Sequence, residues 1–291
     1  MRDTYTSPRA RYAVAKVPQI TILFWIIKII TTALGESTSD YLVTHMDPYV
    51  AVLGGLIAFL LAIKLQFSVR KYIPAVYWMA ALMVAVFGTM VADSVHVALG
   101  VPYQDSTLAF ALILASIFVL WYATEKNLSI HSIDTPRREL FYWLTVFATF
   151  TLGTATGDLT ATAFGWGFLP SGLIFTGIIL AIALAFFLAK AILGPEHRYL
   201  IGTSIFAFWL AYVDTRPLGA SFADWMDKPH LMGGLAWGDG PVCILLLVPL
   251  IILVGYLQIT HRLPEESLPT AVLSTPDIDS PLIQQNPETS D

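Results

Sequence analysis

Charged residues are scarce in this chain, and their scarcity narrows the class of protein first. Asp, Glu, Lys and Arg make up 13% of the 291 residues, whereas apolar residues make up 56%. A typical soluble domain is about one quarter charged. The composition therefore excludes an ordinary soluble globular protein and predicts a polytopic integral membrane protein.

Cysteine is almost absent, since Cys243 is the only one. A single cysteine excludes an internal disulfide framework. The C-terminal stretch 263–291 lacks Lys and Arg but contains six acids, so the rest of the chain has 16 bases and 15 acids and is nearly neutral. This stretch is rich in Pro and Ser with little to bury, and we expect residues 261–291 to form a disordered acidic cytoplasmic tail.

Sequence signatures of known catalytic machinery are also missing. The chain contains no HExxH zinc motif, no Gly-x-Ser-Gly serine site, no Gly-x-Gly-Asp aspartyl site and no Walker A sequence. These absences predict that the protein is neither an enzyme nor an ATP-driven pump. A dyad of Asp158 and Asp224 keeps an intramembrane aspartyl-type enzyme open as a minor alternative.

Eight apolar runs are each long enough to cross a bilayer, which takes about 20 residues in a helix. They lie near 18–40, 49–67, 74–96, 107–124, 140–160, 170–193, 199–224 and 241–260. The predicted fold is therefore all-α, with eight transmembrane helices following an N-terminal arm of residues 1–17. That arm carries four bases but no small-residue cleavage site after a short apolar run, so we expect an uncleaved first helix.

The bases are distributed unevenly between the two kinds of loop. Thirteen of the 16 Lys and Arg residues lie on the side of the N-terminus or at helix ends that open to it, and only Lys228 lies in an opposite loop. The positive-inside rule then places both termini in the cytoplasm.

A tandem repeat organises the membrane domain of residues 18–260. The pattern W-x9-G-x4-D occurs four times, in units that span about 18–73, 74–139, 140–198 and 199–260. Its members are Trp25, Gly35 and Asp40; Trp78, Gly88 and Asp93; Trp143, Gly153 and Asp158; and Trp209, Gly219 and Asp224. A small residue precedes each Asp, and the resulting Gly-xxx-small pattern favours close helix packing. Four parallel two-helix repeats predict that the odd-numbered helices gather around an axis along the membrane normal.

The segment TRPLGASFAD, which follows FWLAYVD at residues 208–214, is the most specific signature in the chain. With the four repeat tryptophans, it resembles the bacterial membrane-anchored proteins built from four tandem repeats of unknown function. The resemblance covers about residues 17–260 and implies the four-unit architecture. It implies no activity, because the family has none established.

The four repeat aspartates lie some 20 residues into their helices, which places them toward the outer face. Each one alone would serve as a helix cap or meet interfacial water. Related by a vertical axis, the four could form a ring of carboxylates that favours cations, and oxygen ligands suit Mg²⁺, Ca²⁺ or Mn²⁺. The sequence does not select a metal. Asp227, His230 and Asp239 lie in the longest outer loop, but their spacing matches no recognised metal site.

Further charges lie deeper in the predicted spans, namely Lys28, Glu36, Asp214 and Arg216. Together with the repeat aspartates they give six acids against two bases, so four carboxylates need a proton, water or a cation. A buried ion-pair network that fixes helix register is one interpretation, and a proton or ion relay is the other. Because units one and four would be neighbours in a closed ring, we expect Lys28 to meet Asp214, or Arg216 to meet Glu36.

Pro217 should kink or interrupt the seventh span, because proline lacks a backbone donor. Interrupted helices near the midplane are where transporters place their substrate sites. These features together predict a secondary transporter or channel-like carrier of the bacterial inner membrane, for a cation or coupled to protons, that needs no cofactor. Its expected partners are the lipid bilayer and a small solute or ion, not nucleic acid. A membrane scaffold or sensor that transports nothing is the main alternative.

Overall fold

A computed structural model describes residues 16–194 and 197–266 of the chain, and these residues form eight α-helices and no β-strand. The helices are α1 (Ile22–His45), α2 (Pro48–Ser68), α3 (Pro74–Asp93), α4 (Tyr103–Glu125), α5 (Pro136–Asp158), α6 (Phe168–Leu193), α7 (Arg198–Asp227) and α8 (Asp239–Glu266). Short π-helical turns, η1 (Ser94–Ala98) and η3 (Leu159–Ala163), follow α3 and α5 directly, and 3₁₀ turns lie at η2 (Ile130–Ser132) and η4 (His230–Met232).

Helix starts follow local sequence signals. Asp47 caps α2 by accepting hydrogen bonds from the backbone of Tyr49 and Val50, with Pro48 in the first turn. Thr135 does the same for α5, again just before a proline. Thr21 caps α1, so this helix begins at Ile22 rather than near residue 18 as the apolar run suggests. These caps explain why α1, α2 and α5 begin where they do.

Six of the eight helices are long and apolar enough to cross a membrane, as is typical of a membrane protein. Among the described residues, α5 and α7 do not belong to this set. Both are rich in polar residues: α5 contains five threonines, and α7 contains Asp214, Arg216, Asp224 and Asp227. Of the eight expected spans, six are therefore supported by length and composition, and α5 and α7 are not.

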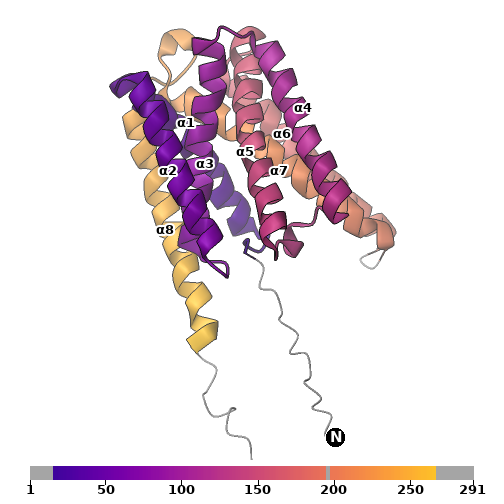
Figure 1. Cartoon of the computed structure of the whole chain (residues 1–291). Coiled ribbons are helices and arrows are strands. Elements are labelled where there is room, and N and C mark those ends of the chain that lie inside the picture. The colour runs from indigo at the N-terminus through magenta and orange to yellow at the C-terminus, as the bar shows by residue number, and fades with distance from the viewer. Residues whose placement is uncertain (1–15, 195–196, 267–291) are drawn as a thin grey trace, which may run out of the picture.

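The helices form two concentric layers (Figure 1). In the inner layer α1, α3, α5 and α7 pack against one another in sequence, and α7 packs back on α1 to close a ring. Each outer helix packs mainly on the inner helix that follows it: α2 on α3, α4 on α5, α6 on α7 and α8 on α1. In their most apolar stretches, 61% of the residues of α1 and 67% of those of α3 are buried, compared with 11% in each of α4, α6 and α8. The repeats thus build an inner ring of buried helices and an outer layer whose exposed surface is apolar.

The repeat glycines lie where neighbouring inner helices touch. Gly35 faces Ala85, Gly88 faces Phe150, Gly153 faces Arg216 and Gly219 faces Thr32. A Cβ at any of the four would stand less than 3.0 Å from the facing side chain. Each facing residue lies seven positions after the tryptophan of the next repeat. One contact is therefore repeated four times around the ring, including from the fourth unit back to the first.

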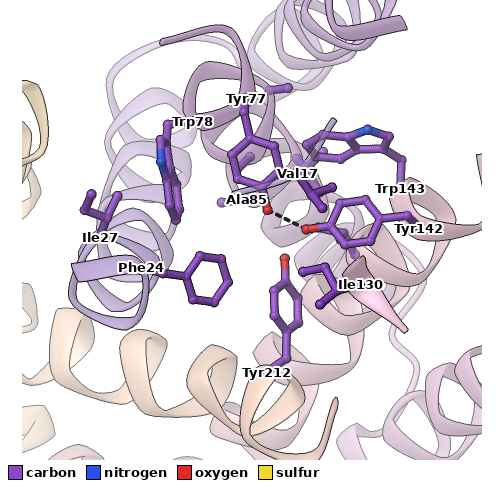
Figure 2. Close-up of a cluster of buried hydrophobic side chains, with 14 of the residues drawn as sticks. Val17, Phe24, Ile27, Tyr77, Trp78, Ala85, Ile130, Tyr142, Trp143 and Tyr212 are labelled. Atoms are coloured by element: carbon purple, nitrogen blue, oxygen red, sulfur yellow. Dashed lines mark hydrogen bonds between the residues drawn. The ribbon is translucent and has the colours of Figure 1, made fainter. Parts of the chain in front are cut away.

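Aromatic side chains fill one end of the ring (Figure 2). The residue before each repeat tryptophan is aromatic, and these residues are Phe24, Tyr77, Tyr142 and Phe208. Tyr77 and Tyr142 share a hydrogen bond between their hydroxyls, and Tyr212 points its hydroxyl toward the pair in Figure 2. Of the repeat tryptophans, Trp78, Trp143 and Trp209 are buried, whereas Trp25 is half-buried. We call this group of Phe, Tyr and Trp side chains the aromatic layer.

Pro217 does not interrupt α7, and the expected break is wrong. The helix is continuous from Arg198 to Asp227 with the proline inside it. The ring of Pro217 lies against Gly153 of α5, which has no side chain to exclude it. Neighbouring helices commonly allow a proline inside a membrane helix in this way.

The ends of the membrane domain also differ from expectation. Helix α8 continues to Glu266, so the first residues of the expected tail are helical. The rest of that tail, 267–291, and residues 1–15 of the expected N-terminal arm lie outside the described residues. The described ends, Lys16 and the end of α8, lie at the same end of the ring, at the bottom of Figure 1. We call this the basic end, because Lys126, Arg137 and Arg138 lie there, and the opposite end the acidic end.

Candidate functional site

Carboxylates from all four inner helices converge at the acidic end. One oxygen each of Glu36, Asp40 and Asp93 lies within 4.8 Å of the other two, and Asp40 forms a second such group with Asp227 and Asp239. Asp158 and Asp224 lie close enough to Glu36 and Asp40 for the like charges of these carboxylates to repel one another. We call these seven side chains the acidic cluster. All four repeat aspartates that the sequence singles out belong to it.

The inner helices position these carboxylates by their common register. Asp93 and Asp158 are the last residues of α3 and α5, and each is followed at once by a π-helical turn. Single π turns in helices occur often at functional sites. Asp40 and Asp224 lie inside α1 and α7, which continue past them without a π turn. At the acidic end, the second and third repeats therefore share a π-helical turn that the first and fourth repeats lack.

Lys228 at the end of α7 neutralises part of the acidic cluster. Its ammonium pairs with Asp40, with Asp224 at 3.6 Å and with Asp227 at 3.8 Å. Burial alone would lower the pKa of Lys228, but the carboxylates of Asp224, Asp40 and Asp227 outweigh it and raise the pKa above its usual value. The ammonium thus stays charged at neutral pH and acts as a built-in cation of the cluster.

Arg216 closes the acidic cluster on the side facing the ring centre. Its guanidinium is fully buried and lies 2.5 Å from the Glu36 carboxylate. It also donates to the backbone carbonyl of Thr32 at 3.2 Å, to the hydroxyl of Thr154 at 2.6 Å and to the hydroxyl of Thr89. The Thr89 hydroxyl in turn donates to Glu36 at 3.1 Å. One guanidinium from α7 therefore contacts α1, α3 and α5.

The expected contact across the closing seam is confirmed for one of the two pairs. Arg216 meets Glu36, whereas Lys28 forms no ion pair with Asp214. The Lys28 ammonium is buried and has no hydrogen bond to the described residues. It lies over the rings of Phe150 and Tyr212, at 4.4 and 4.3 Å from their centroids. Cation–π attraction of this kind stabilises a desolvated cation by about 2 kcal/mol.

Arg216 and Lys28 continue the series of polar groups from the acidic cluster into the ring. Arg216 pairs with Glu36 of the cluster, and both Arg216 and Lys28 lie over the Phe150 ring. The aromatic layer follows toward the basic end. A cation approaching from the acidic end meets carboxylates first and the buried guanidinium of Arg216 and amine of Lys28 next. The arrangement favours cation binding at one end and opposes simple passage through the ring.

The acidic cluster has the donor atoms that a hard cation prefers. Carboxylate and hydroxyl oxygens suit Mg²⁺, Ca²⁺ or Mn²⁺. The Oδ1 atom of Asp227 and the hydroxyls of Ser39 and Ser221 are buried without a hydrogen bond to the described residues. The other oxygen of Asp227 accepts from Ser37 at 3.1 Å. The set resembles neither a zinc site nor a site for a soft metal, because it contains no thiolate or imidazole.

Asp214 lies apart from the acidic cluster. It lines an apolar cleft on the outside of the inner ring, with Pro217 and Gly153. The structure thus places six of the eight charged residues that the sequence predicts as a relay in one connected group: Glu36, Asp40, Asp93, Asp158, Arg216 and Asp224. It leaves Lys28 and Asp214 outside that group.

Several residues of the site were not predicted as site residues from the sequence. Thr89 and Thr154 occupy the same repeat position as Glu36, one residue after the glycine, and that alignment was the available signal. Lys228 was visible as the only base in the loops of its side. Asp227 and Asp239 join the cluster through folding of the loop between α7 and α8, whereas Nδ1 of His230 donates to the carbonyl of Gly234 in its own loop.

Comparison with known proteins bears on the repeats. A family model described as a repeat of unknown function (DUF347) matches four consecutive segments, residues 23–72, 76–127, 141–191 and 207–262. Searches of curated proteins and of solved structures each found no match. Each matched segment holds one inner and one outer helix of the ring. Since these segments make up most of the chain, the protein belongs to the DUF347 repeat family.

Proposed function

We propose that this chain is a secondary transporter that binds a cation at the acidic cluster. The observation that carries the proposal is the convergence of seven carboxylates from α1, α3, α5, α7 and α8 at one end of a closed ring. Arg216 and Lys228 are the Lys and Arg side chains paired with them, so the carboxylates outnumber these bases by five. Such a group needs protons or a bound cation, and rings of carboxylates select cations.

In this proposal all eight helices span a bacterial inner membrane. The six apolar helices supply most of the lipid-facing surface. Helices α5 and α7 are covered by α4 and α6 and by the other inner helices, so their polar side chains need not meet lipid. By the positive-inside rule, the bases at the basic end favour a cytoplasmic location for that end and for both termini. The acidic cluster then opens to the outer side.

Transport requires a change at the centre of the ring. Arg216, which pairs with Glu36 of the cluster, and the aromatic layer lie between the acidic cluster and the basic end. A bound cation competes with Arg216 and Lys228 for the same carboxylates. Movement of the Arg216 guanidinium away from Glu36 would open a route inward, as expected for alternating access between repeats.

The test uses the purified full chain. Binding of Mg²⁺, Ca²⁺ and Mn²⁺ is measured by titration calorimetry, and uptake of each ion into proteoliposomes is followed with an entrapped indicator dye, with and without a pH gradient. Asp40→Asn and Asp93→Asn should each weaken binding about ten-fold or more, since even second-shell changes cost 10–100-fold in metal affinity. Asp105→Asn, an exposed acid of α4, is the matched control and should change neither binding nor uptake.

Two outcomes would contradict the proposal. If the wild type moves none of these ions and no proton, the scaffold alternative gains, with the carboxylates held neutral by protonation. If Asp40→Asn and Asp93→Asn bind and transport as the wild type does, the cluster is not the site. The folded state of each variant is checked by size-exclusion chromatography before transport is scored.

A further inference from the structure

The outer layer leaves a lateral cleft between α4 on one side and α6 and α7 on the other. Because α4 packs mainly on α5 and α6 packs on α7, the two outer helices diverge and the inner helices form the floor. The cleft has a volume of about 1000 Å³. Its walls are apolar, and several lining side chains, such as Val119, Phe206 and Leu210, are largely exposed on the outside of the bundle. In a membrane, this cleft faces the lipid.

Asp214 is the only acid among the residues that line this cleft. Its residue exposure is 9%, and its Oδ2 atom is buried without a hydrogen bond to the described residues. It also forms none of the ion pairs found among the described residues. An unpaired carboxylate in apolar surroundings is costly, so it must be protonated or find a positive partner.

The described residues do not supply that partner. The one Lys or Arg that lines the cleft, Lys126, follows α4 at the basic end, with its ammonium 5.8 Å from the centre of the Tyr122 ring. Trp209 donates to the carbonyl of Leu128 at 2.9 Å, which places this segment at the level of Trp209. Asp214 lies five residues further along α7, about 7.5 Å of helix rise. The repeat positions equivalent to Asp214 are Ile30, Met83 and Ala148, so the acid is specific to this unit.

We propose that the lateral cleft binds a lipophilic organic cation of single positive charge, with Asp214 as its counter-ion. The volume is that of a site for a drug-sized molecule. Apolar walls favour a large apolar body, and one isolated carboxylate favours one charge. This inference rests on the cleft and Asp214 alone and does not depend on cation binding at the acidic cluster.

A second groove provides an internal comparison. It lies between α1, α6 and α7, has a volume of about 630 Å³ and is lined by apolar side chains, with Thr21, Ser204 and Thr215 but no charged residue. A lipid chain can fill either groove by apolar contact. Charge-dependent binding is expected only in the cleft that contains Asp214.

The experiment measures binding of tetraphenylphosphonium to the purified full chain in nanodiscs by equilibrium dialysis, beside an uncharged tetraphenyl analogue of the same shape. The wild type should bind the cation, and Asp214→Asn should weaken binding at least about ten-fold, the expected cost of removing one partner of a buried charge pair. Asp40→Asn, in the acidic cluster, should bind as the wild type does.

A steric variant tests the location without changing a charge. A Cβ at Gly202, which lines the cleft, meets no atom within 4 Å, so Gly202→Phe can fold while its ring fills the cleft. It should reduce tetraphenylphosphonium binding at least about ten-fold. Gly177→Phe is the matched control, because Gly177 is equally open but lies outside the cleft, and it should bind normally.

The proposal is overturned if Asp214→Asn and Gly202→Phe both retain wild-type affinity. It is also overturned if the uncharged analogue binds as tightly as the cation, since the cleft would then be an apolar lipid site. If Asp214→Asn does not fold, Gly202→Phe against Gly177→Phe decides the location and the uncharged analogue decides the role of charge. Loss of ion transport in Asp40→Asn with normal tetraphenylphosphonium binding separates this site from the acidic cluster.

Discussion

Gly219 of the fourth repeat lies directly against Thr32 of the first, so that a Cβ added at Gly219 would stand 2.8 Å from the Cβ of Thr32. The same contact joins Gly35 to Ala85, Gly88 to Phe150 and Gly153 to Arg216. In every pair the glycine lies ten residues after the tryptophan of its own repeat, and the facing residue lies seven residues after the tryptophan of the next repeat. The contact between Gly219 and Thr32 is therefore what closes four tandem units into a ring, and the absence of a side chain at the glycine allows it.

Gly153→Ala should destabilise the protein. The added methyl would collide with the Cβ and Cγ of Arg216, which cannot move freely because its guanidinium is held by three helices. Overpacking of this kind costs about 1–3 kcal/mol, and we expect a lower thermal midpoint in detergent. Gly177→Ala, which meets open space, is the control and should be neutral or slightly stabilising. Equal midpoints for the two variants would contradict the packing role.

The pair of Arg216 and Glu36 should show strong energetic coupling. Glu36→Gln leaves a buried guanidinium without its counter-ion, which costs about 3–5 kcal/mol. The double variant Arg216→Met with Glu36→Met should cost less than the sum of the two single variants. A double-mutant cycle in free energy of unfolding measures the coupling. Arg137→Gln removes an exposed guanidinium from Glu125, which keeps its ion pair with Arg138, and should cost at most about 1 kcal/mol. Strict additivity at Arg216 and Glu36 would refute the coupling.

Much of this fold follows from the sequence because the repeat has fixed spacing. W-x9-G-x4-D places its glycine and aspartate at the same height in four parallel helices. Cyclic arrangement of four such helices then brings the aspartates to one end and joins units one and four. The contact of Arg216 with Glu36 was predictable for this reason, since each residue breaks the repeat in a unit that borders the seam.

Other features depend on packing that spacing does not determine. Pro217 predicts an interrupted helix from local rules, but Gly153 on a neighbouring helix makes room for the proline ring, and α7 stays continuous. Asp214 and Arg216 are two residues apart in the sequence, yet one faces the lateral cleft and the other the ring axis. Lys28 and Asp214 carry opposite charge at similar depth but point to different places. The repeat spacing does not specify which face of each helix points into the ring and which points outward.

Lys28→Met should fold normally and be at least as stable as the wild type. The Lys28 ammonium is buried with no hydrogen bond to the described residues, and its contacts are the rings of Phe150 and Tyr212. Methionine fills a similar volume without the cost of burying a charge, and replacing buried ions by apolar residues often stabilises by about 1–4 kcal/mol. Thermal unfolding in detergent measures the change. A loss of more than about 2 kcal/mol would mean that the cation–π contacts outweigh desolvation.

Lys228→Met should make the thermal stability of the protein more dependent on divalent cations. In the wild type the Lys228 ammonium pairs with Asp40, Asp224 and Asp227, and these carboxylates raise its pKa. A group whose pKa is raised on folding contributes stability that is complete below its unfolded pKa, about 10.4 for lysine, and is lost only at higher pH. Between pH 7 and 9 the ammonium therefore stays charged and competes with an entering cation.

Removing that ammonium should lower the thermal stability when no divalent cation is added. It should also raise the affinity of the acidic cluster for divalent cations about ten-fold or more. The reason is that one unit charge at 4 Å contributes about 4 kcal/mol at an effective dielectric constant of 20. Thermal midpoints measured over a series of Ca²⁺ and Mn²⁺ concentrations report the affinity, because a ligand of the folded state stabilises it in proportion to ln(1 + [L]/Kd). Lys190→Met, an exposed lysine of α6 near the basic end, is the control. If cations shift the midpoints of Lys228→Met and Lys190→Met equally, Lys228 does not share its carboxylates with a bound ion. A larger shift in Lys228→Met alone would show that the lysine competes with a bound cation for these carboxylates.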